Sequence, residues 1–183
     1  NKVIKRLERN AADYMMVYRS IGEMDMTISI ASFRQSIPWY CQPEFQVKQS
    51  IELEEIYHLL LEHPVVNSLK PEKNSIITGS IASGKSTFIK AVAVSAILAQ
   101  TIHTCTARSM KLPKCQVITS MSVKDDLSAG ESYFIREIKY LKRILDSLSE
   151  ERTTLCVVDE ILRGTNTGER IRASTAILTS LSD

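Results

Sequence analysis

The feature that most constrains this chain is a glycine-bounded loop, Gly79-Ser80-Ile81-Ala82-Ser83-Gly84-Lys85-Ser86-Thr87. A short β-branched run at residues 75–78 precedes it, and an apolar helical pattern begins directly behind it. The pattern Gly-x-x-x-x-Gly-Lys-Ser between a strand and a helix is typical of a phosphate-binding loop. Gly79 and Gly84 allow the backbone to curl so that successive amide N–H groups point at one anion, and the helix adds its positive N-terminal end.

The loop side chains have separate expected roles. Lys85 would reach the terminal phosphates of a nucleotide, and the Ser86 hydroxyl would be a ligand of Mg²⁺. The other loop residues expected to line the phosphate site are Ser80, Ala82, Ser83 and Thr87. The competing interpretation is a glycine-rich structural turn, but the flanking strand and helix favour nucleotide binding.

Composition excludes several classes of protein. The chain has 183 residues, 44% of them hydrophobic and 24% charged, with a net charge of +2, which is too small to argue for nucleic acid. No run approaches the roughly 18 apolar residues of a membrane span, and no signal peptide opens the chain. The four cysteines form no C-x-x-C pair and have no histidine at ligand spacing, so we expect neither disulfides nor zinc, as in a reducing cytoplasm. The start at Asn1, without Met, indicates an excised fragment.

Hydrophobic periodicity predicts a helical lead-in over residues 1–40 and an α/β domain over residues 41–183. The expected helices cover residues 1–34, 85–101, 131–149 and 168–181, and the expected strands cover residues 45–47, 75–78, 114–119 and 153–158. This alternation indicates a doubly wound α/β fold of the phosphate-loop (P-loop) NTPase class, with a parallel or mixed sheet flanked by helices.

Two acidic residues, Asp159 and Glu160, follow the apolar strand at 153–158. Ligands of open α/β sheets bind beyond the carboxyl ends of the strands, so this pair is expected to face the phosphate loop. Asp159 would hold Mg²⁺, and Glu160 stands where a general base could take a proton from the attacking water. The alternative is a pair of solvated acids at a strand end. An apolar strand followed by Asp-Glu indicates hydrolysis of the nucleotide and is the pattern of the ABC-type ATPases.

Two segments carry a family resemblance. Residues 125–134 (Asp-Asp-Leu-Ser-Ala-Gly-Glu-Ser-Tyr-Phe) and 159–167 (Asp-Glu-Ile-Leu-Arg-Gly-Thr-Asn-Thr) resemble the ATPase domain of the MutS family of DNA mismatch-repair proteins. Residues 22–33 look like the end of the family's helical lever region. The resemblance implies an ATP- and Mg²⁺-dependent ATPase that dimerises, with itself or a related subunit, around two nucleotides.

The resemblance also assigns residues to the second half of the site. It implies that Gly130 and Ser132 contact the partner's nucleotide, that the loop at 164–167 lies across the dimer contact, and that Val65 and Asn67 contact the adenine. Without the resemblance, residues 128–132 would read equally well as an ordinary helix cap.

The chain departs from the family pattern in two places. Ile81 stands where the family usually has Asn, and the chain stops at Asp183, about where one more strand with the family's switch histidine should follow. His58, His63 and His103 cannot take that role by position, so we expect them to be structural or on the surface. A fragment lacking that strand would bind nucleotide yet turn over poorly.

The expected partner is DNA, bound through domains outside this chain. No basic stripe with interleaved aromatic residues occurs here, and the family's mismatch-reading domain, which some relatives lack altogether, is missing. Two alternatives remain open. One is another ABC-type chromosome or repair ATPase with long coiled-coil arms, and the other is a nucleotide-dependent dimerisation module with little turnover. Ile81 and the missing histidine favour the module, and Glu160 argues against it.

Overall fold

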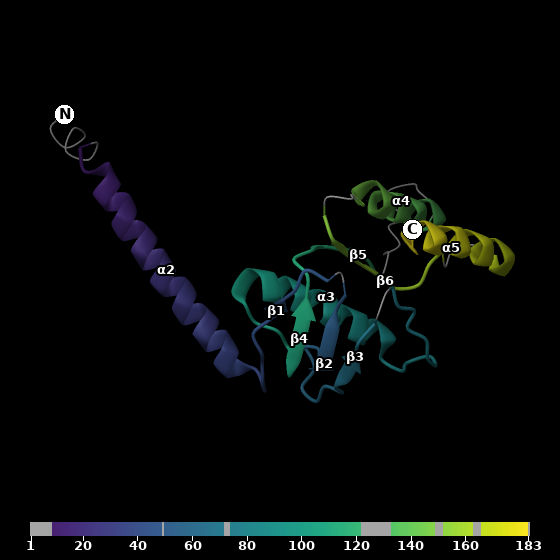
Figure 1. Ribbon diagram of the computed structural model, residues 1–183, viewed down its shortest axis with the longest axis horizontal. Helices are drawn as coiled ribbons and strands as arrows, with labels where there is room; N and C mark the ends of the chain where they lie inside the picture. The colour runs from purple at the N-terminus through teal and green to yellow at the C-terminus, as the bar shows by residue number, and fades with distance from the viewer. Residues whose placement is uncertain are drawn as a thin grey trace. The chain divides into compact units, whose positions relative to one another are not determined.

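The chain divides into two compact units, Asn1–Trp39 and Tyr40–Asp183, in a computed structural model (Figure 1). The structure describes residues 9–48, 50–71, 74–121, 133–148, 152–162 and 166–182. No helix within these ranges is long and apolar enough to cross a membrane.

The first unit contains the single described helix α2 (Ala11–Ser36), and none of its residues is buried. The helix ends just before Pro38. Ile37 is extended, with φ −101° and ψ 151°, because the ring of Pro38 disfavours helical backbone in the residue before it. The expected helix at 1–34 thus agrees with the structure from residue 11, and residues 1–8 lie outside the described part.

A four-stranded sheet opens the second unit, in the order β1-β4-β2-β3. Its strands are β1 (Glu44–Phe45), β4 (Ser109–Leu112), β2 (Glu52–Ile56) and β3 (Asn67–Leu69). Only β1 and β4 are parallel, whereas β2 runs antiparallel to both β4 and β3. The sheet is therefore mixed. Sequence periodicity gave only β1, as the strand at 45–47, and missed the other three.

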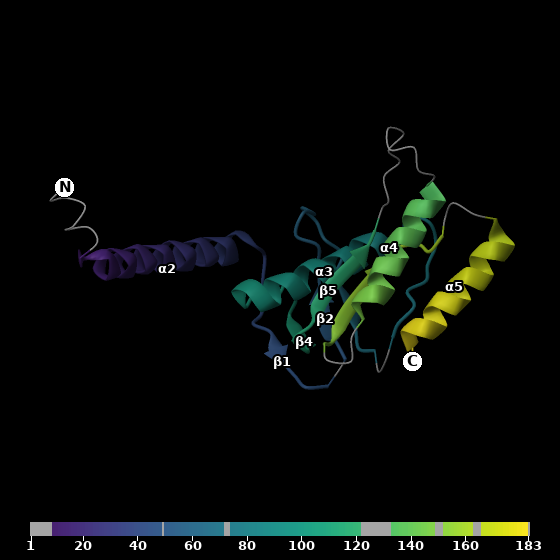
Figure 2. The ribbon, with the colours of Figure 1, turned by 90° about the horizontal axis from the view of Figure 1, so that it is seen from above.

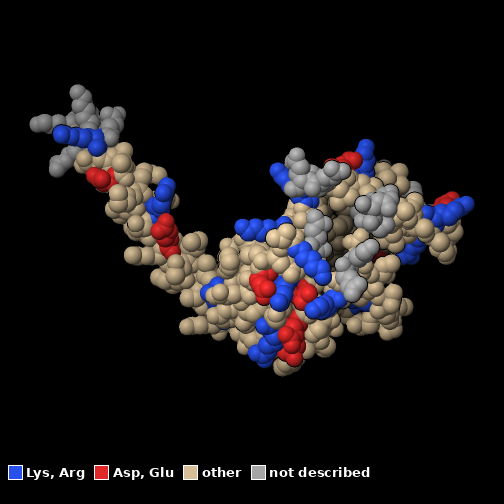
Figure 3. Space-filling model, viewed as in Figure 1, with Lys and Arg blue, Asp and Glu red and all other residues tan. Residues whose placement is uncertain are grey.

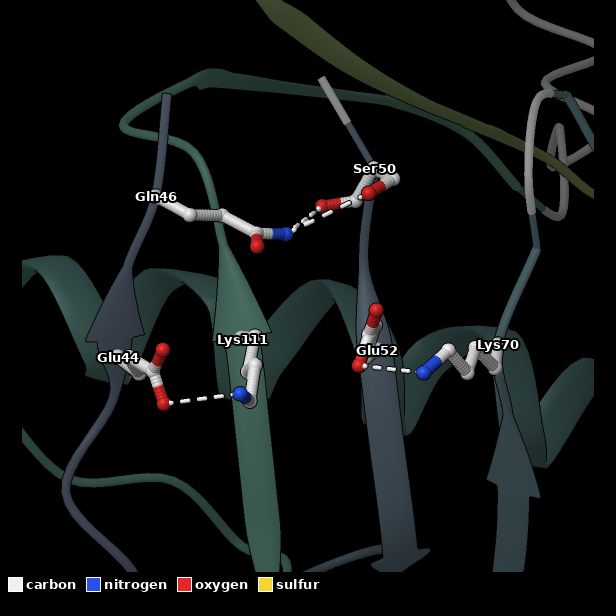
Figure 4. A network of polar contacts seen from close by, with 6 residues as sticks. All are labelled: Glu44, Gln46, Ser50, Glu52, Lys70 and Lys111. Atoms are coloured by element: carbon white, nitrogen blue, oxygen red, sulfur yellow. Dashed lines mark hydrogen bonds and ion pairs between the residues drawn. The ribbon is translucent and has the colours of Figure 1, made fainter. Parts of the chain in front are cut away.

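One face of this sheet carries paired charges. Glu44 and Lys111 are joined across β1 and β4 at 3.2 Å, and Glu52 and Lys70 across β2 and the end of β3 at 3.2 Å (Figure 4). Both signs are interspersed over this face (Figure 3). Because the pairs are largely exposed, each contributes at most about 1 kcal/mol to stability.

A second, two-stranded sheet pairs β5 (Gln116–Ser120) with β6 (Thr154–Val158) in parallel, from Gln116↔Thr154 to Ser120↔Val158. Helix α4 (Tyr133–Ser147) packs against β5 (Figure 2). A small core forms there around Ile118, Leu141 and Ile144, and α5 (Thr167–Ser182) adds side chains at its edge. These four elements lie where periodicity predicts them, except that residues 131, 132 and 149 fall outside the described part.

Helix α3 (Lys85–Ile102) connects the two sheets, since one hydrophobic core contains side chains from both. The helix contributes mainly small residues, including Ala91, Ala96 and Ala99. Small side chains allow strands to approach the helix closely. The helix contacts β2 of the first sheet and both strands, β5 and β6, of the second.

A buried hydroxyl of α3 ties it to the segment that follows. The Ser95 side chain is fully buried, and its Oγ accepts the Thr106 backbone N–H at 3.0 Å and donates to Met110 Sδ at 3.4 Å. A buried donor that loses its partner costs its full desolvation energy. Ser95 is therefore a structural residue of the core.

We predict that Ser95→Ala lowers the free energy of unfolding by about 1–3 kcal/mol, because it leaves the Thr106 N–H without its acceptor. Urea denaturation measures this loss. The matched control is Thr101→Ala on the same helix, whose exposed hydroxyl donates to Ile97 O, with an expected change within about 0.5 kcal/mol. Equal losses in the two variants would contradict the role of Ser95.

Candidate functional site

The segment before the phosphate loop is not a strand. Residues 75–78 were expected to pair in a sheet, but they belong to neither sheet, and Ile76 is 75% exposed. β-branched residues favour a strand only where a neighbouring strand accepts their hydrogen bonds, and in the described structure none pairs with this run. The loop therefore stands between an irregular segment and α3.

The loop backbone enters α3 through left-handed residues. Gly84 is the N-cap of α3 with φ 86°, and Ala82 has φ 61°. Glycine adopts this conformation without steric cost, which explains its position at the cap. At Gly79 an added Cβ would lie 2.8 Å from Ser83 Oγ, so the Ser83 hydroxyl would have to shift to make room for it. The left-handed backbone thus favours glycine at Gly84, and the close approach of the Ser83 hydroxyl favours it at Gly79.

The Lys85 ammonium is held inside its own loop. Its Nζ donates to Ser80 O at 2.7 Å and to Gly79 O at 3.0 Å, with a longer contact of 3.4 Å to Ser83 Oγ. A lysine ammonium has three donors and no acceptor, so carbonyl oxygens satisfy it in the place of an anion. The arrangement concentrates positive charge at the start of α3.

The first turn of α3 adds backbone donors to the same place. The first bond of the helical ladder runs from Phe88 N–H to Gly84 O at 2.9 Å, so the amides of Lys85, Ser86 and Thr87 lie ahead of it. Such first-turn amides have no acceptor within their own helix and carry the positive end of the helix dipole. A helix N-terminus of this kind attracts anions, so a phosphate site at this place stays a prediction.

The acidic pair directly follows β6, as the sequence predicts. Asp159 N–H donates to Ser120 O at 2.9 Å and extends the pairing with β5, while Glu160 is exposed with φ 58°. Leu162 has φ 55° and is buried in the core beside α4. Non-glycine residues in this conformation cost about 1 kcal/mol or more, and buried Leu162 anchors the turn that imposes it.

Helix α3 contacts β6, the strand that precedes the two acids, and Phe88 of α3 and Leu155 of β6 both pack against the shared core. This contact places the loop-bearing helix and the acid-bearing strand in one packed body. The convergence of Asp159 and Glu160 on Lys85 stays a prediction.

The structure leaves other expected site residues undecided. Gly130 and Ser132 lie outside the described residues, as does the stretch at 163–165. Val65 is 80% exposed, and Asn67 begins β3 and donates from Nδ2 to Val65 O at 3.4 Å. Their role at the adenine stays a prediction.

The histidines have structural contacts or lie exposed. His58 Nδ1 accepts the Leu60 N–H at 3.2 Å, and His63 is exposed. His103 caps the C-terminus of α3 in a left-handed conformation, and its ring meets Phe45 edge-on at 5.5 Å between centroids.

Two cysteines that lie far apart in the sequence are paired in the fold, and their spacing does not predict it. Cys41 and Cys105 form an isolated antiparallel β-bridge, and all four cysteines of the chain are free thiols. Residues so far apart in sequence meet only through the tertiary fold, so a search for C-x-x-C motifs could not find them.

Comparison with known proteins gives the family. Residues 75–183 match the model of MutS domain V. The chain is 27% identical to the DNA mismatch repair protein MutS of Leptospira interrogans, over the whole chain and 22% of that protein. It is 28% identical to the DNA mismatch repair protein msh3 of Aspergillus fumigatus, over 96% of the chain and 16% of that protein. It is 32% identical to MutS protein homolog 4 of Homo sapiens, over 83% of the chain and 17% of that protein.

The chain thus spans about a fifth of the length of these relatives. The matched domain begins four residues before Gly79 and includes the phosphate loop, α3, the acidic pair and α5. Because the domain model matches more than half of the sequence, this chain belongs to the MutS family.

Proposed function

We propose that the second unit is a P-loop ATPase domain of the ABC type that binds ATP and Mg²⁺. The observation that supports it most is the loop at Gly79–Lys85, where an ammonium and first-turn helix amides converge. Lys85 would exchange the carbonyls of Gly79 and Ser80 for phosphate oxygens. An ionic acceptor makes a stronger hydrogen bond than a neutral carbonyl, so the exchange is favourable.

The chain's own oxygens would hold the metal only in part. No three His, Cys, Asp or Glu side chains of the described residues could together hold a metal ion. That fits Mg²⁺, which usually takes one or two protein ligands and completes its shell with water and substrate phosphates. Ser86 and Asp159 would be the protein ligands, and bound Mg²⁺ would neutralise charge on the phosphates. Glu160 would accept a proton from the attacking water.

At the level of the whole protein, we propose a MutS-like repair factor in which ATP binding closes two subunits. The relatives named as DNA mismatch repair proteins support a role in DNA repair. DNA would be bound by parts of the protein outside this chain. Gly130 and Ser132 would complete the partner's nucleotide site. Hydrolysis would separate the two subunits again and change the orientation of the helices attached to them.

A second candidate is a nucleotide-dependent dimerisation module with little turnover. Ile81 favours it, because this apolar side chain is 98% exposed in the phosphate loop, where the family usually has a polar residue. Glu160 favours hydrolysis. The two candidates share the binding site and differ in the chemical step.

Lys85→Ala is expected to weaken ATP binding roughly 10- to 100-fold, since charge-assisted hydrogen bonds contribute about 1.5–3 kcal/mol. Titration calorimetry with ATP and Mg²⁺ measures the change in Kd. Lys90→Ala, five residues along the same helix, removes the same charge and should leave Kd unchanged. An unaltered Kd in Lys85→Ala would overturn the proposed phosphate site.

Glu160→Gln is expected to lower kcat for ATP at least about 100-fold with Kd retained, because it removes the general base. Glutamine has nearly the same shape, so the left-handed backbone of residue 160 is not further strained. Glu169→Gln, in the first turn of α5, is the charge-matched control and should keep wild-type turnover. Equal rates in wild type and Glu160→Gln would remove Glu160 as the base, and a wild type that binds but does not turn over would favour the module.

Closure of two subunits around ATP should double the mass of the protein in solution. Light scattering of the full-length protein carrying Glu160→Gln is expected to give a doubled solution mass with ATP and Mg²⁺, because slow hydrolysis keeps the subunits closed. The same protein without nucleotide should not double. A mass that stays unchanged while ATP is demonstrably bound would rule out a nucleotide site shared by two subunits.

A further inference from the structure

The Cys41–Cys105 bridge lies where the chain enters the second unit. Cys41 N–H donates to Cys105 O at 3.1 Å, and Cys105 N–H donates to Cys41 O at 2.9 Å. Two residues that exchange both backbone bonds in this way have Cα atoms about 5.5 Å apart and side chains on the same face. That separation lies within the range that disulfides span, about 4.4–6.8 Å.

The two thiols occupy different environments. Cys105 is fully buried in the main core, whereas Cys41 lies at its edge and is partly exposed. The Cys105 side chain hydrogen-bonds Cys41, which lowers the pKa of the Cys41 thiol despite its partial burial. The same hydrogen bond, together with burial, raises the pKa of Cys105. Cys41 is therefore the thiol that ionises more readily, and the thiolate is the reactive form.

The other two cysteines lack this arrangement. Burial raises the pKa of both Cys115 and Cys156, and neither is bridged to a cysteine in the described part of the chain. The thiolate is the species that reacts with oxidants, so these two thiols are expected to be inert. They serve as internal controls.

We propose that Cys41 and Cys105 are a reversible redox pair that closes to a disulfide when the protein meets a hydroperoxide. The Cys41 thiolate attacks the peroxide and becomes a sulfenic acid as the O–O bond breaks and hydroxide leaves. The Cys105 thiol then displaces the sulfenic oxygen, which leaves as water. Two thiols and one hydrogen peroxide give one disulfide and two waters, and a dithiol reductant restores the pair.

The disulfide would join the segment that follows α2 to the segment that follows α3. Cys41 follows the Ile37–Tyr40 connection from α2, and Cys105 follows the end of the helix that begins at the phosphate loop. The bond closes a long loop that contains β1, β2, β3 and α3. Closing such a loop constrains the unfolded chain and stabilises the fold. The proposal concerns this bond alone and holds whether or not the domain hydrolyses ATP.

The test compares the reduced full-length protein before and after hydrogen peroxide. Free thiols are blocked with N-ethylmaleimide, the protein is digested without reductant, and mass spectrometry identifies linked peptides. The variants are Cys41→Ser and Cys105→Ala, with Cys115→Ser as the matched control. Thermal unfolding with and without dithiothreitol gives an independent readout for wild type.

We expect a Cys41–Cys105 linked peptide in wild type and in Cys115→Ser, its loss on reduction, and its absence in both Cys41→Ser and Cys105→Ala. In Cys105→Ala, Cys41 should instead carry a sulfenic acid that dimedone traps, which tests the assignment even if that variant is less stable. The oxidised wild type should unfold on the order of 10 °C higher than the reduced protein. Reduced Cys41 after peroxide treatment, or linkage of Cys41 to another cysteine in preference to Cys105, would overturn the proposal.

Discussion

The packing of α3 is the constraint on which the second unit depends. One helix covers parts of two sheets, and alanines at 91, 96 and 99 supply the close contact. A larger residue at these positions would push β2, β5 or β6 away from the helix, because packed cores do not deform smoothly. The sheets do not share a strand, so the helix is what makes them one body.

The same packing fixes the orientation of the helix that the phosphate loop enters. The loop is exposed and irregular, but it ends in the N-cap of a helix that is held in the core. The amides of the first turn therefore point along an axis that the packing of α3 fixes. The hydrogen bonds from Lys85 Nζ to the carbonyls of Gly79 and Ser80 hold the ammonium within the loop.

Sequence reasoning succeeded where the signal is local. Helices α3, α4 and α5 have apolar faces that repeat within a few residues, and β6 is a continuous apolar run, so all four were predicted close to their bounds. Strands β2 and β4 were missed because they are short and their charged residues face solvent between buried ones. The prediction of a strand at residues 75–78 was wrong. Their β-branched composition favours a strand, but no described strand pairs with them. The glycine loop and the acidic pair were found by motif, but the cysteine bridge depends on distant pairing that no local pattern encodes.

The order of strands has a consequence for how the chain matures during synthesis. β1 pairs with β4, Glu44 opposite Lys111, so the first strand of the unit has no neighbour until some sixty residues more have left the ribosome. At about 5–20 residues per second this delay lasts roughly 3–13 s. During that interval the apolar side chains of β1, β2 and the alanine-rich helix have no completed core. Exposed apolar side chains and an unpaired strand are the features that make a folding chain prone to aggregation, so the pairing of β1 with β4 prolongs that exposure.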